Sequence, residues 1–246
     1  MNDKDIEKYR YDGRAKKLLG LKNYERSRQD PCYLQPAVSS YRSLLEQINP
    51  GSKVLEIGAG MGEHTELLLE LGLVVCATDI STKSVEILVD RFADRPFFSA
   101  ETADLESLPF GDNTFNVVCS AGSLSYGDNS LVMNEIHRVL DNGGAFIALD
   151  SLSNNPIYKL NRYLHFLRGN RSKSTLERMP TVDLINSYAV KFGNTDVAYF
   201  GSLTWLFPIL TKFFSDESIL AISNKFDKII SVRKSAFKFT MKVTKS

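Results

Sequence analysis

Glycine residues stand at alternate positions in residues 54–65, whose sequence is VLEIGAGMGEHT. An apolar run leads into Gly58, Gly60 and Gly62, and a helical pattern follows. Glycine permits backbone conformations that a Cβ forbids, so such a loop can bring the chain close to a ligand at a helix amino terminus. A dinucleotide fingerprint requires G-x-G-x-x-G, but Glu63 stands where its third glycine belongs. The spacing therefore disfavours NAD.

Carboxylates near this loop indicate which ligand it could hold. Glu56 and Glu63 would repel a pyrophosphate but suit a ligand that carries ammonium and sulfonium charges. Asp79 closes the next apolar run, where a carboxylate can accept hydrogen bonds from both hydroxyls of a ribose. Alternatively Asp79 only caps the following helix, but Ser81 already offers that cap. We therefore predict a ribose-binding role for Asp79.

Apolar runs alternate with helical patterns through the first 150 residues. The runs occupy residues 53–57, 73–78, 96–100, 115–120 and 144–150, and Gly143 and Gly144 are predicted to form the turn into the last of them. Between the runs, apolar residues recur at helical spacing in residues 67–71, 85–92 and 132–140. This alternation predicts an α/β fold with a doubly wound parallel sheet that has helices on both faces.

The pattern changes after Asp150. Residues 151–180 are polar and basic without a strand pattern, which predicts an insertion, or cap, over the carboxyl ends of the strands. A helix is predicted for residues 181–192, a strand for 195–201 and near-helical spacing for 215–232. Apolar and polar residues alternate in residues 236–245, which predicts a half-exposed, edge-like strand. A membrane-binding amphipathic helix is the alternative for this segment.

Composition excludes several classes of protein. The 246 residues are 43% hydrophobic and 24% charged, which is enough for a globular core. Lys and Arg number 30 against 29 Asp and Glu, which argues against a nucleic-acid-binding protein. Cys32, Cys76 and Cys119 show neither a disulfide framework nor zinc-site spacing, so no metal is predicted. An amino terminus without an apolar stretch, and no apolar run of the ~20 residues that span a bilayer, favour a cytoplasmic protein.

Five segments occur in an order that is more specific than any one of them. They are VLEIGAGMG at 54–62, ATD at 77–79, ADLESLPF at 103–110, FNVVCSAGSLSY at 115–126 and EIHRVLDNGGAFIALD at 135–150. Together, over residues 39–150, they resemble the class I S-adenosylmethionine-dependent methyltransferases. The resemblance implies a seven-stranded Rossmann-like sheet with an antiparallel last strand. It also implies a single methyltransferase domain over residues 1–246, with a lid segment at 1–37, a cofactor-binding core at 38–150, a helical cap insertion at 151–180 and carboxyl-terminal strands and helix at 181–246.

The resemblance implies S-adenosyl-L-methionine as the cofactor. The residues implied to contact it are Glu56, Gly58, Ala59, Gly60, Asp79, Ile80, Asp104, Leu105, Ser120 and Ala121. Residues 56–60 would line the methionine part and Asp79 would bind the ribose. Residues 80 and 105 would pack beside the adenine, Asp104 would accept from its amino group, and residues 120–121 would flank the sulfonium. The amino-terminal stretch around Tyr11 and Arg14 resembles the mobile lid helix of this superfamily, or is a plain surface helix.

Few residues are candidates for the chemistry of methyl transfer. The reaction needs an acceptor held in line with the methyl group and water excluded, and a hydroxyl acceptor also benefits from a base. The catalytic candidates are His165 in the cap, Asp128 and Tyr126. Asp150 also follows a strand end and could face the acceptor. His64 is interpreted as a hydrogen-bonding neighbour of the cofactor rather than as a base.

The acceptor is less well indicated than the cofactor. Six cap bases suit either an anionic acceptor or a solvated surface: Lys159, Arg162, Arg168, Arg171, Lys173 and Arg178. Residues 155–169 and 200–214 resemble methyltransferases of bacterial surface polysaccharide biosynthesis, which implies O-methylation of a sugar, a sugar phosphate or another small acceptor. The alternatives are C-methylation of a quinone or lipid-like acceptor, with residues 205–210 as an apolar site or peripheral membrane contact, and a non-catalytic binding protein of the same fold. The pattern indicates no oligomeric state.

Overall fold

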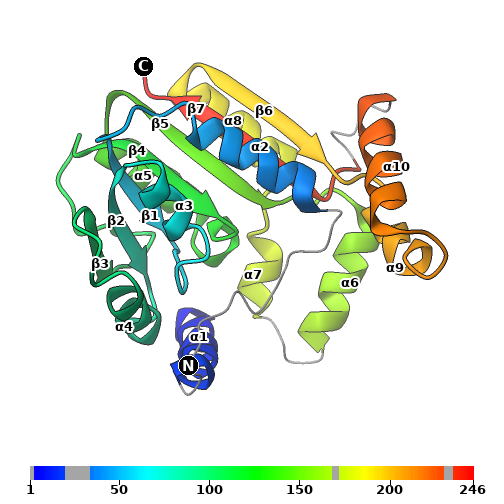
Figure 1. Ribbon diagram of the computed structural model, residues 1–246, viewed down its shortest axis with the longest axis horizontal. Coiled ribbons are helices and arrows are strands. Elements are labelled where there is room, and N and C mark those ends of the chain that lie inside the picture. The colour runs from blue at the N-terminus through cyan, green and yellow to red at the C-terminus, as the bar shows by residue number, and fades with distance from the viewer. Residues whose placement is uncertain (1–2, 20–33, 168–171, 230–234) are drawn as a thin grey trace.

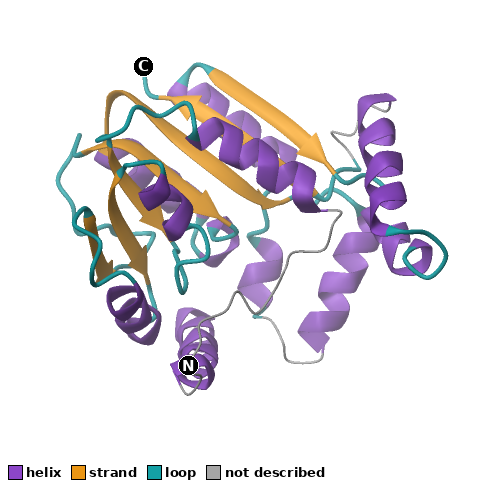
Figure 2. Ribbon diagram, in the orientation of Figure 1, coloured by secondary structure: helices purple, strands orange, loops and turns teal. Residues whose placement is uncertain are grey.

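Seven strands form one mixed sheet in a computed structural model, which describes residues 3–19, 34–167, 172–229 and 235–246 (Figures 1 and 2). The strand order is β3-β2-β1-β4-β5-β7-β6, and β7 runs antiparallel to both of its neighbours. The strands are β1 Lys53–Ile57, β2 Val74–Asp79, β3 Phe98–Thr102, β4 Phe115–Ala121, β5 Leu140–Ser151, β6 Thr195–Phe200 and β7 Lys238–Thr244. The predicted doubly wound sheet with an antiparallel last strand is confirmed.

Helices cover both faces of this sheet (Figure 1). Alternate residues of a strand point to opposite faces, so Val54 and Ile147 pack on the side of α2 and α3, while Leu55 and Phe146 pack on the side of α5 and α8. The α-helices are α1 Asp3–Leu19, α2 Gln35–Leu45, α3 Thr65–Glu70, α4 Thr82–Arg91, α5 Asn129–Val139, α6 Pro156–Leu167, α7 Lys173–Glu177, α8 Val182–Phe192, α9 Phe207–Leu210 and α10 Asp216–Ile229. Two short 3-10 helices are η2 Leu124–Tyr126 and η3 Thr204–Leu206.

The structure corrects two predictions about the strands. β7 is not an edge strand, because β6 pairs with its outer side; its alternation buries Phe239, Met241 and Val243. β5 also begins earlier than predicted, at Leu140, so Gly143 and Gly144 lie within its bounds; the chain leaves the β4 ladder there, since residues 141–144 lie between the partners of Phe115 and Val117. The β4–β5 register shifts between Phe115 and Val117, and Gly143 takes a φ of +75°. This irregularity is a bulge within the strand, where a left-handed φ favours glycine.

The cap is helical, as predicted, and consists of α6 and α7. Ser172 begins α7 because its side chain accepts a hydrogen bond from the Thr175 N–H. α7 packs against η2, and with α1 it lies at the end of the sheet where the parallel strands finish (Figure 1). Arg168, Arg171 and Cys32 lie outside the described residues. Within the described ranges, none of the helices combines the length and apolarity needed to cross a bilayer.

Candidate active site

A cleft with an open volume of about 940 Å³ lies between α1 and the carboxyl ends of β1, β2 and β4. Nine of the ten predicted cofactor residues line it: Glu56, Gly58, Ala59, Gly60, Asp79, Ile80, Asp104, Leu105 and Ala121. The tenth, Ser120, is fully buried behind the wall. Its hydroxyl lies 2.6 Å from that of Ser123, which does line the cleft. The structure therefore places the predicted cofactor residues around one cavity and replaces Ser120 by Ser123 at its surface.

Two glycines of the loop, Gly58 and Gly60, differ in what a side chain would meet at their positions. Gly58 has a φ of +64°, and a Cβ there would lie 2.3 Å from the Cβ of Ser123, so only glycine lets the loops after β1 and β4 pack so closely. Gly60 has a φ of +58°, but a Cβ there would meet no atom of the described residues within 4 Å. Gly58 therefore serves the packing of the fold, whereas Gly60 leaves room beside the cleft.

Asp79 fixes the glycine loop from the end of β2. One carboxylate oxygen accepts from the Gly60 N–H and the other from the Ser81 N–H, each at 2.9 Å. Burial raises the pKa of Asp79, and these two N–H donors oppose the rise. Ser81, as predicted, caps α4 by accepting from the Ser84 N–H. Because each carboxylate oxygen has two acceptor sites, Asp79 retains capacity for ligand hydroxyls.

Glu56 is a buried carboxyl group in the wall of the cleft. Its Oε2 accepts from the Thr65 hydroxyl at 2.6 Å. Burial raises the pKa of Glu56 to about 7, and the nearby negative charge of Asp79 adds to the rise while the Thr65 hydroxyl opposes it. A cation bound in the cleft would favour the ionised form of this group.

Helix α1 covers the cleft with one polar stripe. The stripe consists of Lys4, Glu7, Tyr11 and Arg14, which all line the cavity and are spaced three or four residues apart, as neighbours on one helix face are. Lys4 Nζ lies 2.6 Å from both Asp104 Oδ2 and Glu106 Oε2. The spacing shows that these four side chains share one helix face, but only the docking of α1 places Lys4 and Glu7 in the cleft.

Two further contacts bind α1 to the rest of the site. The Tyr11 hydroxyl donates to the Tyr126 hydroxyl at 3.0 Å, so α1 contacts the loop that follows β4. Glu7 is buried and accepts from the hydroxyl of Ser172, the cap of α7, at 3.1 Å and from that of Thr175, within α7, at 3.2 Å. The amino-terminal helix is thereby joined to both the core and the cap.

The structure brings only one of the three predicted catalytic residues to the cleft. Tyr126 lines it. Asp128 instead caps α5, where it accepts from the Ser130 and Leu131 N–H groups, and His165, on α6, is not among the residues that line the cleft. Asp150 is buried outside the cleft and accepts from the Leu124 N–H at 3.0 Å, which holds the loop after β4 in place. His64, by contrast, lines the cleft, as its predicted role beside the cofactor requires.

The described basic residues of the cap lie outside the cleft. Lys159 is exposed, and the Arg162 guanidinium donates to the Tyr158 hydroxyl at 2.7 Å. Lys173 pairs with Glu177 on the surface of α7. Of the Lys and Arg side chains that the structure describes, those that line the cleft are Lys4 and Arg14, both from α1. The cap therefore supplies no described cation to an acceptor in this cleft.

Comparison with known proteins shows what the segment around this site is similar to. Residues 55–148 match the family model described as a methyltransferase domain. Three curated relatives are similar to part of the chain. The sterol 4-C-methyltransferase strm-1 of Caenorhabditis elegans is 34% identical over 112 residues, which are 44% of this chain and 34% of that protein. The demethylmenaquinone methyltransferase of Corynebacterium urealyticum is 38% identical over 100 residues, 39% of this chain and 40% of that protein.

The third relative is matched over more of its length. The ubiquinone/menaquinone biosynthesis C-methyltransferase UbiE of Burkholderia mallei is 30% identical over 150 residues, 56% of this chain and 61% of that protein. The chain thus spans less than two thirds of the curated relatives named here. The match supports the methyltransferase class of the domain and leaves the activity of the whole protein to be proposed.

Solved structures share the fold across most of the chain. Geranyl diphosphate methyltransferase, in complex with GPP and sinefungin, has a TM-score of 0.62 at 15% identity, and the match covers 96% of this chain and 93% of that one. The phosphoethanolamine N-methyltransferase 2 of Haemonchus contortus, with S-adenosylhomocysteine bound, has a TM-score of 0.61 at 15% identity and coverage of 100% and 58%. The [4+2]-cyclase SpnF has a TM-score of 0.61, 15% identity and coverage of 99% and 96%. Different reactions on one fold mean that function must be argued from the site.

Proposed function

We propose that the protein is a methyltransferase that uses S-adenosyl-L-methionine. The observation that carries this proposal is the position of Asp79, which ends β2 beside the glycine loop in a cleft whose core segment matches a methyltransferase domain. Ligands of open α/β sheets collect at the carboxyl ends of the strands, and a carboxylate there can accept from two ribose hydroxyls.

The charge of the cleft suits this cofactor. Five carboxyl groups line it, against the two cations Lys4 and Arg14: Glu7, Glu56, Glu63, Asp79 and Asp104. A cofactor with an ammonium and a sulfonium group is attracted by such a lining, whereas a pyrophosphate is repelled. Ile80 and Leu105 offer apolar surface to an adenine ring. Asp104 would accept a hydrogen bond from the adenine amino group. For this, the ion pair between Lys4 and Asp104 Oδ2 would have to break.

The bound cofactor supplies a methyl group on a positively charged sulfur, from which the acceptor displaces a neutral thioether. The residues of this chain position the acceptor and exclude water from it. Burial raises the pKa of Tyr11, and the neighbouring Tyr126 raises it further, so the Tyr11 hydroxyl stays protonated near neutral pH. Tyr11 therefore orients groups by hydrogen bonding and does not serve as a base.

The acceptor is a nucleophilic carbon atom of a reduced quinone (a quinol) or of another lipid-like molecule, which forms the bond to the methyl group and then loses its proton to solvent. Three relatives named above carry C-methyltransferase or menaquinone methyltransferase names. The basic cap residues that suggested an anionic sugar acceptor do not line the cleft where they are described. These two observations favour C-methylation over O-methylation of a sugar or sugar phosphate, which is retained as the competing outcome of the test.

Two measurements test the proposal in sequence. Isothermal titration with S-adenosylhomocysteine tests the cofactor site, and absence of binding would favour a non-catalytic protein of the same fold. Incubation with cofactor carrying a labelled methyl group, and with fractionated quinones, sterols, lipid-linked sugars and nucleotide sugars, then tests the acceptor. Label in the quinone or sterol fraction supports C-methylation of a lipid-like acceptor. Label confined to the sugars overturns that acceptor and leaves the cofactor assignment intact.

A further inference from the structure

Helix α6 presents an apolar stripe to solvent. Its residues Ile157, Leu160, Leu164 and Leu167 recur at i, i+3, i+7 and i+10, which is the pattern of a helix face that is normally buried. All four are exposed, Leu160 to 59%, and no residue of α6 is buried. Isolated helices of this length are marginal in water, because most helical stability in proteins comes from covering an apolar face. The residues that the structure describes therefore leave the α6 stripe uncovered, although its sequence pattern is that of a buried helix face.

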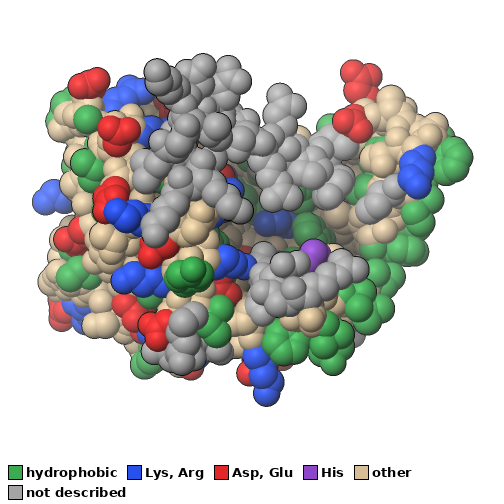
Figure 3. All heavy atoms as spheres, turned by 90° about the horizontal axis from the view of Figure 1, so that it is seen from below, with side chains coloured by type: hydrophobic (Ala, Val, Ile, Leu, Met, Phe, Trp, Pro, Cys, Tyr) green, Lys and Arg blue, Asp and Glu red, His purple; other side chains and the backbone are tan. Residues whose placement is uncertain are grey.

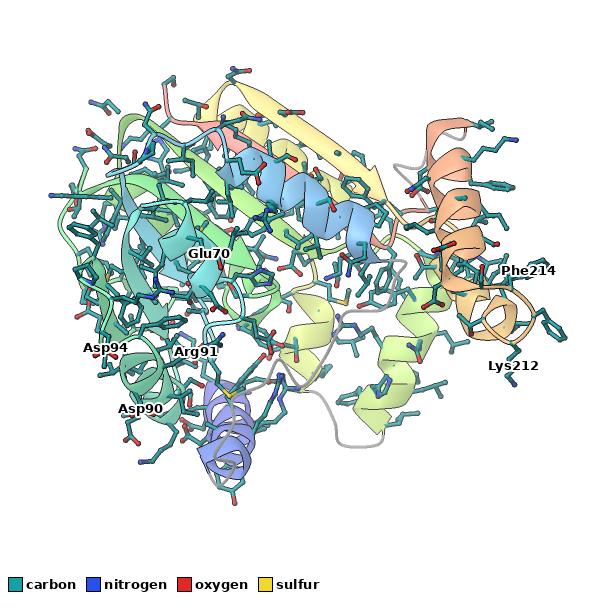
Figure 4. The ribbon with its side chains drawn as sticks, in the orientation of Figure 1. Glu70, Asp90, Arg91, Asp94, Lys212 and Phe214 are labelled. Atoms are coloured by element: carbon teal, nitrogen blue, oxygen red, sulfur yellow. The ribbon has the colours of Figure 1, made fainter. Side chains whose placement is uncertain are left out.

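A second exposed apolar group lies in η3, α9, α10 and the turn between them. Its members are Trp205, Ile209, Phe213, Phe214, Phe226 and Ile229. Phe213 is 76% exposed, and Phe214 projects outward beside Lys212 (Figure 4). In Figure 1, α6, α9 and α10 lie together on the side of the molecule away from β3, and hydrophobic side chains run along that edge in Figure 3. Single exposed apolar residues are ordinary, whereas a gathered apolar surface marks a protein or membrane interaction site.

Basic residues accompany this surface. Residues 156–173 contain five Lys or Arg and no acid, whereas residues 216–234, which include all of α10, contain four Lys or Arg and three acids, Asp216, Glu217 and Asp227. Among them, Lys159 on α6 and Lys225 on α10 are exposed, as is Lys212 beside α9. Aromatic and aliphatic side chains with lysines among them are typical of surfaces that enter the boundary between lipid headgroups and acyl chains. Protein–protein interfaces, by contrast, are depleted of lysine.

We propose that α6, η3, α9 and α10 form a docking face that seats the protein on a bilayer containing anionic lipid. The apolar stripe of α6 and the exposed aromatic residues of η3, of the turn after α9 and of α10 enter the acyl boundary, and the lysines contact the headgroups. The docking face adjoins the cleft, because α6 packs on α7, and α7 holds Glu7 of α1 through Ser172 and Thr175. Its use in delivering a lipid-like acceptor rests on the proposed function, but bilayer binding itself does not.

Vesicle co-sedimentation of the full chain tests the proposal without acceptor or turnover. We expect binding to vesicles of phosphatidylcholine with phosphatidylglycerol, and binding at least about tenfold weaker to phosphatidylcholine alone or at high salt. Two double variants, Leu160→Gln with Leu164→Gln and Phe213→Ser with Phe214→Ser, should each weaken binding by about tenfold or more, because each removes two inserted side chains. Val190→Gln is the matched control, since Val190 is 88% exposed on α8, outside the docking face.

The affinity for S-adenosylhomocysteine, measured by titration, should be unchanged in all three variants. A variant that fails this control or loses its thermal transition is replaced by Lys159→Glu with Lys225→Glu, which should lower binding to anionic vesicles severalfold without touching the apolar core. Absence of wild-type binding to both vesicles, or equal binding by wild type and docking-face variants, overturns the proposal. So does sedimentation velocity showing that the wild type is a dimer which the docking-face variants dissociate, because the face would then bind a second copy. None of these outcomes bears on cofactor binding, so the two proposals fail separately.

Discussion

The hydroxyl of Tyr11 donates a hydrogen bond of 3.0 Å to the hydroxyl of Tyr126, although the two residues are 115 positions apart in the chain. Their rings meet edge to face, with centroids 5.7 Å apart. Tyr126 lies in η2, directly after the strand whose end forms part of the cleft, and Tyr11 belongs to the helix that covers it. This contact joins α1, which covers the cleft, to η2, which follows β4.

Loss of this hydrogen bond should loosen α1. For Tyr11→Phe we expect trypsin to cleave within α1 about three to ten times faster, because a net hydrogen bond contributes roughly 0.5–1.5 kcal/mol and cleavage follows the population of the open form. Tyr9→Phe is the control, since Tyr9 is 74% exposed on the same helix. S-adenosylhomocysteine should slow cleavage of the wild type. Equal cleavage rates in both variants, with and without ligand, would show that α1 is not a cover of the site.

Removal of the Asp79 charge should weaken the cofactor site. Asp79→Asn keeps one acceptor for the loop N–H groups but loses the second ribose acceptor, so we expect the Kd for S-adenosylhomocysteine to rise by at least about tenfold, equivalent to ~1.4 kcal/mol. Asp90→Asn removes the same charge from the exposed side of α4 and should leave the Kd unchanged (Figure 4). Isothermal titration measures the Kd of both variants. Equal Kd values for Asp79→Asn and Asp90→Asn would exclude Asp79 as the ribose ligand.

A methyl group at Gly60 should abolish ligand binding while the protein still folds. Gly60→Ala places a Cβ beside the cleft without a clash in the fold, so we expect loss of S-adenosylhomocysteine binding together with a stability cost of roughly 1–2 kcal/mol from the left-handed backbone. Gly51→Ala is the matched control, because Gly51 has a φ of +81°, no described neighbour near a Cβ and a position outside the cleft. Thermal unfolding should show similar losses for both variants, and titration should show lost affinity in Gly60→Ala alone. Retained affinity in Gly60→Ala would mean that the ligand does not approach this backbone.

The raised pKa of Glu56 predicts a pH dependence of cofactor binding. The neutral carboxyl stabilises the fold fully below its usual pKa near 4.5, and this contribution is lost as the pH rises through about 7. A bound cation favours the ionised form, so ligand binding below pH 7 must release a proton. We expect the affinity for S-adenosylhomocysteine to fall by about tenfold from pH 8 to pH 6.

Glu56→Gln is the control for this effect, because it cannot ionise. Titration across the pH range should give a flatter profile for the variant than for the wild type, and calorimetry in buffers of different ionisation enthalpy should detect proton release by the wild type only. An equally steep profile in the Gln variant would assign the pH dependence to the ligand or to another group.

The sequence determined the sheet, the glycine loop and the cofactor-type lining. Strand and helix patterns are local, because a period of two or of 3.6 residues is written in consecutive positions. The helix cap at Ser81 and the position of Asp79 at the end of β2 follow from the same local order. Parallel strands bring their carboxyl ends to one edge, and the resemblance to a known family assigned residues 56–60, 79–80 and 104–105 to one site at that edge.

Only the tertiary structure decided which of the remaining polar residues share that site. His165 and Asp128 are plausible by residue type, but the packing of α6 and the start of α5 place them elsewhere. Lys4 and Glu7 enter the cleft because α1 docks across strands that lie about a hundred residues further along the chain. Contacts at such separations depend on how whole elements pack, and no pattern in neighbouring residues encodes them.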